Sequence, residues 1–139
     1  MVDDLEEDIF FVSRAWEKSG LSEFFHGVKD GQEAIAYLQG EGKYQDRQQF
    51  PFSSLMLTDL KMPGMDGYAL LKWLHSHPEC NVIPTIVLSS SALQKDVKQA
   101  YELGADAYLV KPGAPEDMVK LMVRAHDFWT ICKIPERQT

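Results

Sequence analysis

A small set of acidic, hydroxyl and basic residues stands directly beside apolar segments of this chain. The set consists of the pair Asp3 and Asp4, then Asp59, Ser89 and Lys111. Three carboxylates supply enough negative charge to hold one magnesium ion, a hard cation that prefers oxygen ligands. Asp59 could then act as a nucleophile toward phosphorus, with the metal rather than a neighbouring base activating it. These residue types predict phosphoryl transfer to a carboxylate.

The remaining two residues suit the same reaction. Phosphoryl transfer passes through a loose transition state, so catalysis consists mainly of charge neutralisation and in-line positioning. The Lys111 ammonium would supply positive charge, and the Ser89 hydroxyl would donate to a phosphoryl oxygen. Taken singly, each residue has an ordinary explanation, because Asp and Ser often cap helices or occupy turns and a lone Lys is usually solvated. Their shared position in the fold therefore decides between the two interpretations.

Apolar strands and amphipathic helices alternate along the chain. Helices are expected at 5–20, 34–40, 66–77, 92–103 and 118–132, and strands at 24–28, 55–58, 83–89 and 107–110. Asp66 is placed to cap the third helix. Parallel strands need crossover connections, so this alternation predicts an α/β fold with a doubly wound parallel sheet and helices on both faces. Ligands of such sheets bind beyond the carboxyl ends of the strands, where Asp59, Ser89 and Lys111 stand.

Composition limits the function classes. The chain has 139 residues, 14 basic and 21 acidic, with a formal net charge of −7. We expect a single domain over residues 1–139, without an output domain. An acidic chain without a Lys/Arg-rich run lacks the charge to bind nucleic acid or an anionic membrane, and no apolar stretch approaches the roughly 18 residues of a membrane helix. We expect a cytoplasmic protein whose two cysteines, Cys80 and Cys132, stay reduced.

Several motifs of the chain resemble those of a known family. The run LTDLKMPGMDG at 57–67 resembles the phosphoacceptor loop of response-regulator receiver domains in two-component systems. The segment Val2-Asp3-Asp4 is similar to that family's acidic pair, 86–89 to its hydroxyl-bearing strand end, and 108–112 to its switch aromatic and lysine. The segment 40–44, together with Phe128-Trp129, is similar to stand-alone regulators paired with phytochrome-type sensor kinases.

The resemblance implies a role for each site residue. Asp59 would accept a phosphoryl group from a partner histidine kinase. Asp3 or Asp4, with Asp59 and the backbone carbonyl of Lys61, would hold Mg²⁺. Ser89 and Lys111 would bind the phosphoryl group.

Switching and partner contacts are also implied. Tyr108 would move inward together with Ser89 on phosphorylation; a partly exposed aromatic covering the sheet edge is the alternative interpretation. Residues 92–132 resemble the face that family members use for homodimerisation and for contacts with a downstream protein. The resemblance further implies a cis peptide bond between Lys111 and Pro112, since proline lowers the cost of the cis form.

The chain departs from the family at its beginning. The flavodoxin-like strand order 2-1-3-4-5 places an apolar first strand in the middle of the sheet, and only Met1 and Val2 precede the acidic pair. We therefore expect a first strand that is missing or truncated in this chain. A native start further upstream is favoured over a shifted second strand or a strand supplied by another chain. Without that strand, Asp3 and Asp4 would be poorly anchored.

Three functions follow. The leading hypothesis is a single-domain response regulator that presents a phosphorylation-dependent surface. The second is a receiver-fold adaptor that works without phosphorylation, which the short first strand motivates. The third is a magnesium-dependent phosphatase of the haloacid dehalogenase type, which is disfavoured because such enzymes carry an acid two residues after the nucleophile, where this chain has Lys61. We therefore expect a phosphoacceptor signalling domain rather than an enzyme.

Overall fold

The computed structural model describes residues 1–21 and 23–135, and strands and helices alternate in it from β1 onward. The three strands of the sheet are parallel and adjacent in the order β1-β2-β3. In chain order, the elements are α1 (Glu6–Lys18), α2 (Gly31–Gln39), the 3₁₀ helix η1 (Gly42–Gln45), β1 (Met56–Thr58), α3 (Gly67–Ser76), β2 (Thr85–Ser89), α4 (Gln94–Glu102), β3 (Ala107–Val110) and α5 (Pro115–Ile131). The prediction of a doubly wound parallel α/β fold is confirmed.

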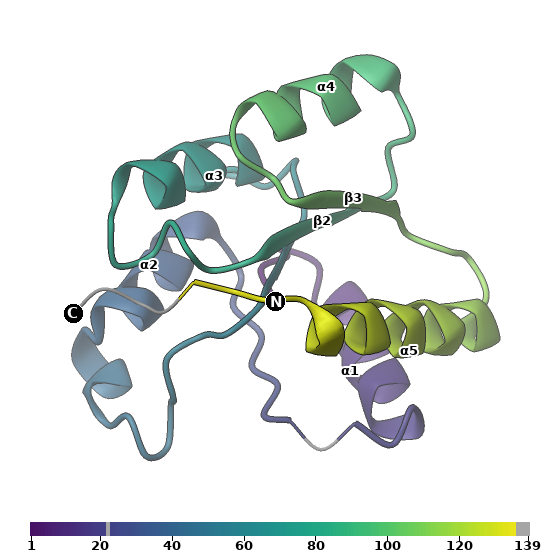
Figure 1. The fold of residues 1–139 in the computed structure, drawn as a ribbon, viewed down its shortest axis with the longest axis horizontal. Coiled ribbons are helices and arrows are strands. Elements are labelled where there is room, and N and C mark those ends of the chain that lie inside the picture. The colour runs from purple at the N-terminus through teal and green to yellow at the C-terminus, as the bar shows by residue number, and fades with distance from the viewer. Residues whose placement is uncertain (22, 136–139) are drawn as a thin grey trace.

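Both faces of the sheet are covered, because successive strand residues point to opposite sides. Met56 belongs to one buried cluster with Leu70 of α3. Its neighbour Leu57 belongs to another, with Val12 of α1 and Met122 of α5. Figure 1 shows the result: α1 and α5 lie together on one side of the strands, and α3 and α4 lie on the other. This packing fixes the strand ends that carry the candidate site.

The first strand of the expected sheet is reduced to one bridged residue. Val2 forms isolated parallel bridges with Val28 on one side and Thr58 on the other. Counting these bridges, the order across the sheet is Val28, Val2, β1, β2, β3, which corresponds to 2-1-3-4-5. The position of the first strand in that order is thus held by Val2 as a single bridged residue.

Two expectations about this region are wrong. Residues 24–28 do not form a strand, since only Val28 is bridged and the segment lacks a longer neighbouring strand to pair with. The acidic pair is well anchored at its base: Asp3 is fully buried, its N–H donates to the Val28 carbonyl (3.0 Å), and the Val2 N–H donates to the Leu57 carbonyl (2.8 Å). Even a very short strand is held firmly when it lies between two neighbours.

Local signals set the helix ends. The Asp66 carboxylate accepts from the Ala69 N–H at 2.9 Å, so the predicted cap of α3 is confirmed. The Asp30 carboxylate caps α2 in the same way, accepting from the Glu33 N–H at 2.8 Å. Such caps satisfy backbone donors that a helix leaves free at its start.

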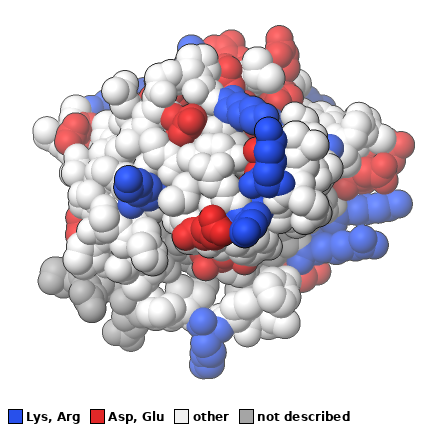
Figure 2. Space-filling model, turned by 90° about the horizontal axis from the view of Figure 1, so that it is seen from above, with Lys and Arg blue, Asp and Glu red and all other residues white. Residues whose placement is uncertain are grey.

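The surface and the cysteines agree with the composition. Acidic and basic side chains are interspersed on the face shown in Figure 2, and neither charge covers it. Among the described residues, no helix has both the length and the apolar character needed to cross a bilayer. Neither Cys80, which is buried, nor Cys132 forms a disulfide in the described part of the chain.

The contact between His126 of α5 and Glu23 makes stability depend on pH. His126 Nε2 lies 2.6 Å from Glu23 Oε1, and this hydrogen bond raises the pKa of His126 above its usual 6.5, against a smaller opposing effect of burial. The stabilisation is complete below the unfolded-state pKa and is lost as pH rises through the higher folded-state pKa. We expect His126→Gln to lower the melting temperature at about pH 6 and to have little effect at about pH 9.

Thermal unfolding of His126→Gln and of the unchanged protein between about pH 6 and about pH 9 measures the difference in melting temperature. Glu23→Gln should remove the same pH-dependent component, whereas His75→Gln, at an exposed histidine of α3, should leave it in place. A His126→Gln deficit that is equal at both pH values would show that the ion pair is not its cause.

Candidate functional site

The predicted site residues meet at one edge of the sheet. Asp59 follows the last residue of β1, Ser89 ends β2, and Lys111 follows β3, where its N–H donates to the Ser89 carbonyl at 2.8 Å. The turn after Asp59 passes very close to α3: a Cβ atom on Gly67 would lie 2.0 Å from the Asp59 carbonyl oxygen. Only glycine fits there, so Gly67 allows this turn to close against the helix.

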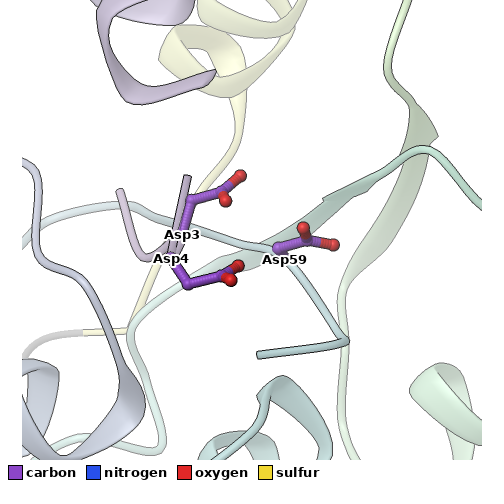
Figure 3. A group of neighbouring side chains, drawn as sticks. All are labelled: Asp3, Asp4 and Asp59. Carbon is purple, nitrogen blue, oxygen red and sulfur yellow. The ribbon is translucent and has the colours of Figure 1, made fainter. Parts of the chain in front are cut away.

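Three carboxylates are gathered at this edge. Carboxylate oxygens of Asp3, Asp4 and Asp59 all lie within 4.8 Å of one another. Figure 3 shows the three side chains directed to the same side, two from the N-terminal segment and one from the end of β1. Asp3 Oδ1 accepts from the Leu5 N–H (3.0 Å) and Asp59 Oδ1 from the Leu60 N–H (2.7 Å), so backbone donors orient both groups.

The Lys111 ammonium is the positive charge of the cluster. Its Nζ lies 2.7 Å from Oδ2 of Asp3, 2.7 Å from Oδ2 of Asp8 and 3.2 Å from Oδ2 of Asp59. An ammonium has three N–H donors, so all of them are engaged. Asp8, in the first turn of α1, was not among the predicted site residues. No sequence spacing singled it out, because its partner Lys111 lies 103 residues away in the chain.

Burial and neighbouring charges shift the pKa of both Asp3 and Lys111. Burial raises the pKa of Asp3, against the lowering effect of the hydrogen bond from Lys111. Burial also opposes the charge of Lys111, yet the hydrogen bonds to Asp3 and Asp8 and the charge of Asp59 outweigh it and raise the pKa of Lys111. The ammonium therefore stays protonated at neutral pH.

The donor set fits a divalent cation. Four carboxylates, those of Asp3, Asp4, Asp8 and Asp59, face one ammonium, so negative charge remains in excess. Hard divalent cations bind such oxygen ligands, and the mutual repulsion of grouped carboxylates favours that binding. The three carboxylates within 4.8 Å of one another are the ligands that the structure offers.

A hydrogen-bond network leads from Ser89 toward α4. The Ser91 N–H donates to Ser89 Oγ at 3.1 Å, and the Ser91 carbonyl accepts from the Tyr108 hydroxyl at 2.8 Å. Ser91 Oγ in turn donates to Asp96 Oδ2 at 2.5 Å, and the Tyr68 hydroxyl donates to Asp96 Oδ1 at 2.9 Å. The serine and the aromatic residue predicted to switch together are thus connected through a single intervening residue.

Buried Asp96 stabilises this network, although no sequence pattern singled it out. The hydrogen bonds from Ser91 and Tyr68 lower the pKa of Asp96. Burial, together with the hydrogen bond to Asp96, raises the pKa of Tyr68 to about 12, so its hydroxyl remains a donor. Asp96 lies in the first turn of α4, where an acidic residue is normally solvated, and only its tertiary neighbours identify it as buried.

Two further expectations concern Lys61 and Pro112. The Lys61 side chain points away from the cluster, with Nζ 3.6 Å from Asp96 Oδ2, and the role of its backbone carbonyl stays a prediction. The expected cis peptide between Lys111 and Pro112 is wrong: no cis bond occurs among the described residues. The ion pairs of Lys111 are formed with a trans bond after it.

Comparison with known proteins agrees with this geometry. The family model of the response regulator receiver domain matches residues 1–123, which is most of the chain. The chain belongs to the response regulator receiver family. As a receiver domain, it is a signalling protein rather than a conventional enzyme, and receiver domains accept phosphate from histidine kinases.

The similar proteins confirm the narrower resemblance to phytochrome response regulators. Response regulator Rcp1 of Synechocystis sp. is 31% identical over 129 residues, covering 93% of this chain and 86% of Rcp1. The phosphorylated cyanobacterial phytochrome response regulator RcpA superimposes with a TM-score of 0.85 at 30% identity, covering 97% and 95% of the two chains. The Mn²⁺-bound form of Rcp1 superimposes with a TM-score of 0.81 at 30% identity, covering 97% and 96%.

Replacement of Lys111 by an uncharged residue should destabilise the protein, because the negative charge of the cluster is then no longer neutralised. In Lys111→Met, buried Asp3 and its carboxylate neighbours lose their cation, and we expect the free energy of unfolding to fall by about 3 kcal/mol. Millimolar magnesium or manganese chloride should recover more stability in this variant than in the unchanged protein, because a divalent cation replaces the missing charge. Urea unfolding with and without the salt measures both quantities.

Lys98→Met is the matched control, since the Lys98 side chain is 79% exposed and pairs with Glu102 at the surface. It should change stability by less than about 0.5 kcal/mol. Equal stability of Lys111→Met and the unchanged protein, without a response to the salt, would contradict the electrostatic role of Lys111.

Proposed function

We propose that this protein is a response regulator in which Asp59 accepts a phosphoryl group from a phytochrome-type sensor histidine kinase. The observation that carries the proposal is the position of the Asp59 carboxylate, oriented by the Leu60 N–H and 3.2 Å from the Lys111 ammonium at the carboxyl end of the sheet. The similarity to Rcp1 and RcpA supports the choice of kinase class. We propose that residues 1–139 act as a single receiver domain.

The proposed chemistry uses the chain's own groups for positioning. A carboxylate oxygen of Asp59 would attack phosphorus, forming a P–O bond while the donor's P–N bond breaks and its electron pair leaves with the imidazole nitrogen. Lys111 would turn one of its three donors from a carboxylate to a phosphoryl oxygen, and Ser89 Oγ would donate to another. We assign Mg²⁺ as the physiological cation at Asp3, Asp4 and Asp59, where it would neutralise charge on the phosphoryl oxygens.

Phosphorylation of Asp59 would affect the molecular surface through the hydrogen bonds of Ser91. A phosphoryl group that draws Ser89 Oγ toward itself would break the hydrogen bond from Ser91, whose carbonyl holds Tyr108. This supports a shift between two packings of Tyr108, biased by a contact present in only one of them. Apolar side chains are exposed beyond it, namely Leu93 (54%), Tyr101 (49%) and Val110 (46%). We propose the 92–132 face as the surface for a downstream protein or a second copy.

The alternatives receive no support from a specific observation. A phosphatase would need an acid two residues after Asp59, and the Lys61 found there is paired with Asp96. A phosphorylation-independent adaptor would not require the cluster of Asp59 with Lys111 and two further carboxylates.

Asp59→Asn should abolish phosphorylation. We expect intact-mass analysis to show one labile phosphoryl group after incubation of the unchanged protein with magnesium and acetyl phosphate, and none in the variant, since an amide is a far weaker nucleophile than a carboxylate. Asp127→Asn is the control, because the Asp127 side chain is exposed near the other end of α5. A phosphoryl group on Asp59→Asn would show that another residue is the acceptor. Its absence from both proteins would favour the phosphorylation-independent adaptor.

Asp4→Asn should weaken the binding of Mg²⁺ and Mn²⁺ by roughly ten-fold or more, because it removes one of three anionic ligands. Isothermal titration calorimetry measures this directly. Glu6→Gln, at an exposed glutamate that pairs with Lys29, should bind both metals as the unchanged protein does. Unchanged affinity in Asp4→Asn would remove Asp4 from the ligand set.

A further inference from the structure

The Lys111 ammonium is shared unequally among its three carboxylate partners. Its Nζ lies 2.7 Å from Oδ2 of Asp3 and 2.7 Å from Oδ2 of Asp8, but 3.2 Å from Oδ2 of Asp59. An ammonium has three N–H donors, so each carboxylate takes one of them. The two shorter contacts of Lys111 are therefore made with residues other than the proposed phosphoryl acceptor.

Asp3 is not a partner that Lys111 can give up at small cost. The Asp3 side chain is fully buried, with Oδ1 accepting from the Leu5 N–H at 3.0 Å and Oδ2 accepting from Lys111. A buried carboxylate that loses its cation leaves an uncompensated charge in the protein interior. The contact between Asp3 and Lys111 is therefore a fixed part of the site.

Asp8 differs from Asp3 in its access to solvent. Its side chain is 31% exposed, in the first turn of α1. Asp8 and Lys111 both line an open cavity of about 430 Å³ between α1, the loop after β3 and α5, so water can reach the carboxylate on that side. An acidic residue in the first turn of a helix is also stabilised by the helix dipole, without any ion pair. Asp8 can therefore release the ammonium far more readily than Asp3 can.

A phosphoryl group on Asp59 would increase the demand on Lys111. Such a group carries up to about two negative charges, where the Asp59 carboxylate carried one. A donor held by Asp8 is not available to a phosphoryl oxygen, and the charge of Asp8 beside the same ammonium repels the phosphoryl group. Asp8 and the phosphoryl group therefore compete for one cation.

We propose that Asp8 is a positioning residue that competes with the phosphoryl group on Asp59 for the Lys111 ammonium, an inference that rests on the proposed function. In the unphosphorylated protein Asp8 holds Lys111 toward α1 at 2.7 Å. On phosphorylation that donor turns to a phosphoryl oxygen, and the Asp8 carboxylate becomes solvated. The competition lowers the stability of the phosphorylated state. Its strength is set by a residue outside both the acceptor loop and the three carboxylates assigned to the metal.

Beryllofluoride, which binds to an aspartate carboxylate as a mimic of a phosphoryl group, tests this competition on the whole chain. Fluorine NMR at saturating magnesium measures its affinity. Asp8→Asn and Asp8→Ser both remove the competing charge, and we expect each to bind beryllofluoride at least about three-fold more tightly than the unchanged protein. Glu7→Gln is the matched control, because it removes the same charge from an exposed neighbour in the same turn of α1. It should bind beryllofluoride as the unchanged protein does.

Magnesium affinity, measured by calorimetry without beryllofluoride, separates this competition from a structural defect. Without Asp8, Lys111 interacts more strongly with Asp3 and Asp59, so both Asp8 variants should bind Mg²⁺ more weakly while they bind beryllofluoride more tightly. A structural defect would weaken the binding of both.

Beryllofluoride affinity in the two Asp8 variants at or below that of the unchanged protein would overturn the inference, and so would an equal gain in Glu7→Gln. Failure of the proposed function is a different result. In that case the unchanged protein itself would take up neither beryllofluoride nor a phosphoryl group from acetyl phosphate, which would overturn the proposed function and the competition together.

Discussion

The ion-pair cluster around Lys111 Nζ is the interaction on which the functional end of this molecule depends. Its three carboxylate partners come from the N-terminal segment (Asp3), from α1 (Asp8) and from the end of β1 (Asp59), while Lys111 follows β3. Four parts of the chain thus converge on one ammonium. Grouped carboxylates repel one another, so they stay together only where a cation neutralises them. The same excess of negative charge makes the site receptive to a divalent cation.

Lys111 is also connected to the rest of the sheet edge. Its N–H is bonded to the carbonyl of Ser89, and Ser89 Oγ is bonded to Ser91, which holds Tyr108. Through Asp96 the same serine reaches α4. Ser89 is therefore connected by hydrogen bonds to residues near the surface, while Val87 and Leu88 of the same strand are fully buried in the core.

The centre of the sheet shows how little backbone is needed to position the acidic pair. Met1 to Asp3 lie between Val28 and Leu57, held by ladder hydrogen bonds on both sides. Val2 is 2% exposed and packs into the cluster that contains Met56 and Leu70. The segment that positions Asp3 is thus fixed by backbone hydrogen bonds on both sides and by burial of the Val2 side chain.

Much of this arrangement follows from the sequence alone. Apolar runs that end at Asp59, Ser89 and Lys111, alternating with amphipathic helices, imply parallel strands whose carboxyl ends share one edge, so the sequence predicted both the fold and the location of the site. The Asp66 cap was predictable for the same reason, since it is a local hydrogen bond. Tertiary structure alone decided that Asp8 pairs with Lys111, that Asp96 is buried beneath Ser91 and Tyr68, that residues 24–28 contribute a single bridge, and that Lys111 precedes a trans proline. Periodicity shows which side of an element faces the sheet, but the partner of a polar group across tens of residues depends on packing that no local pattern encodes.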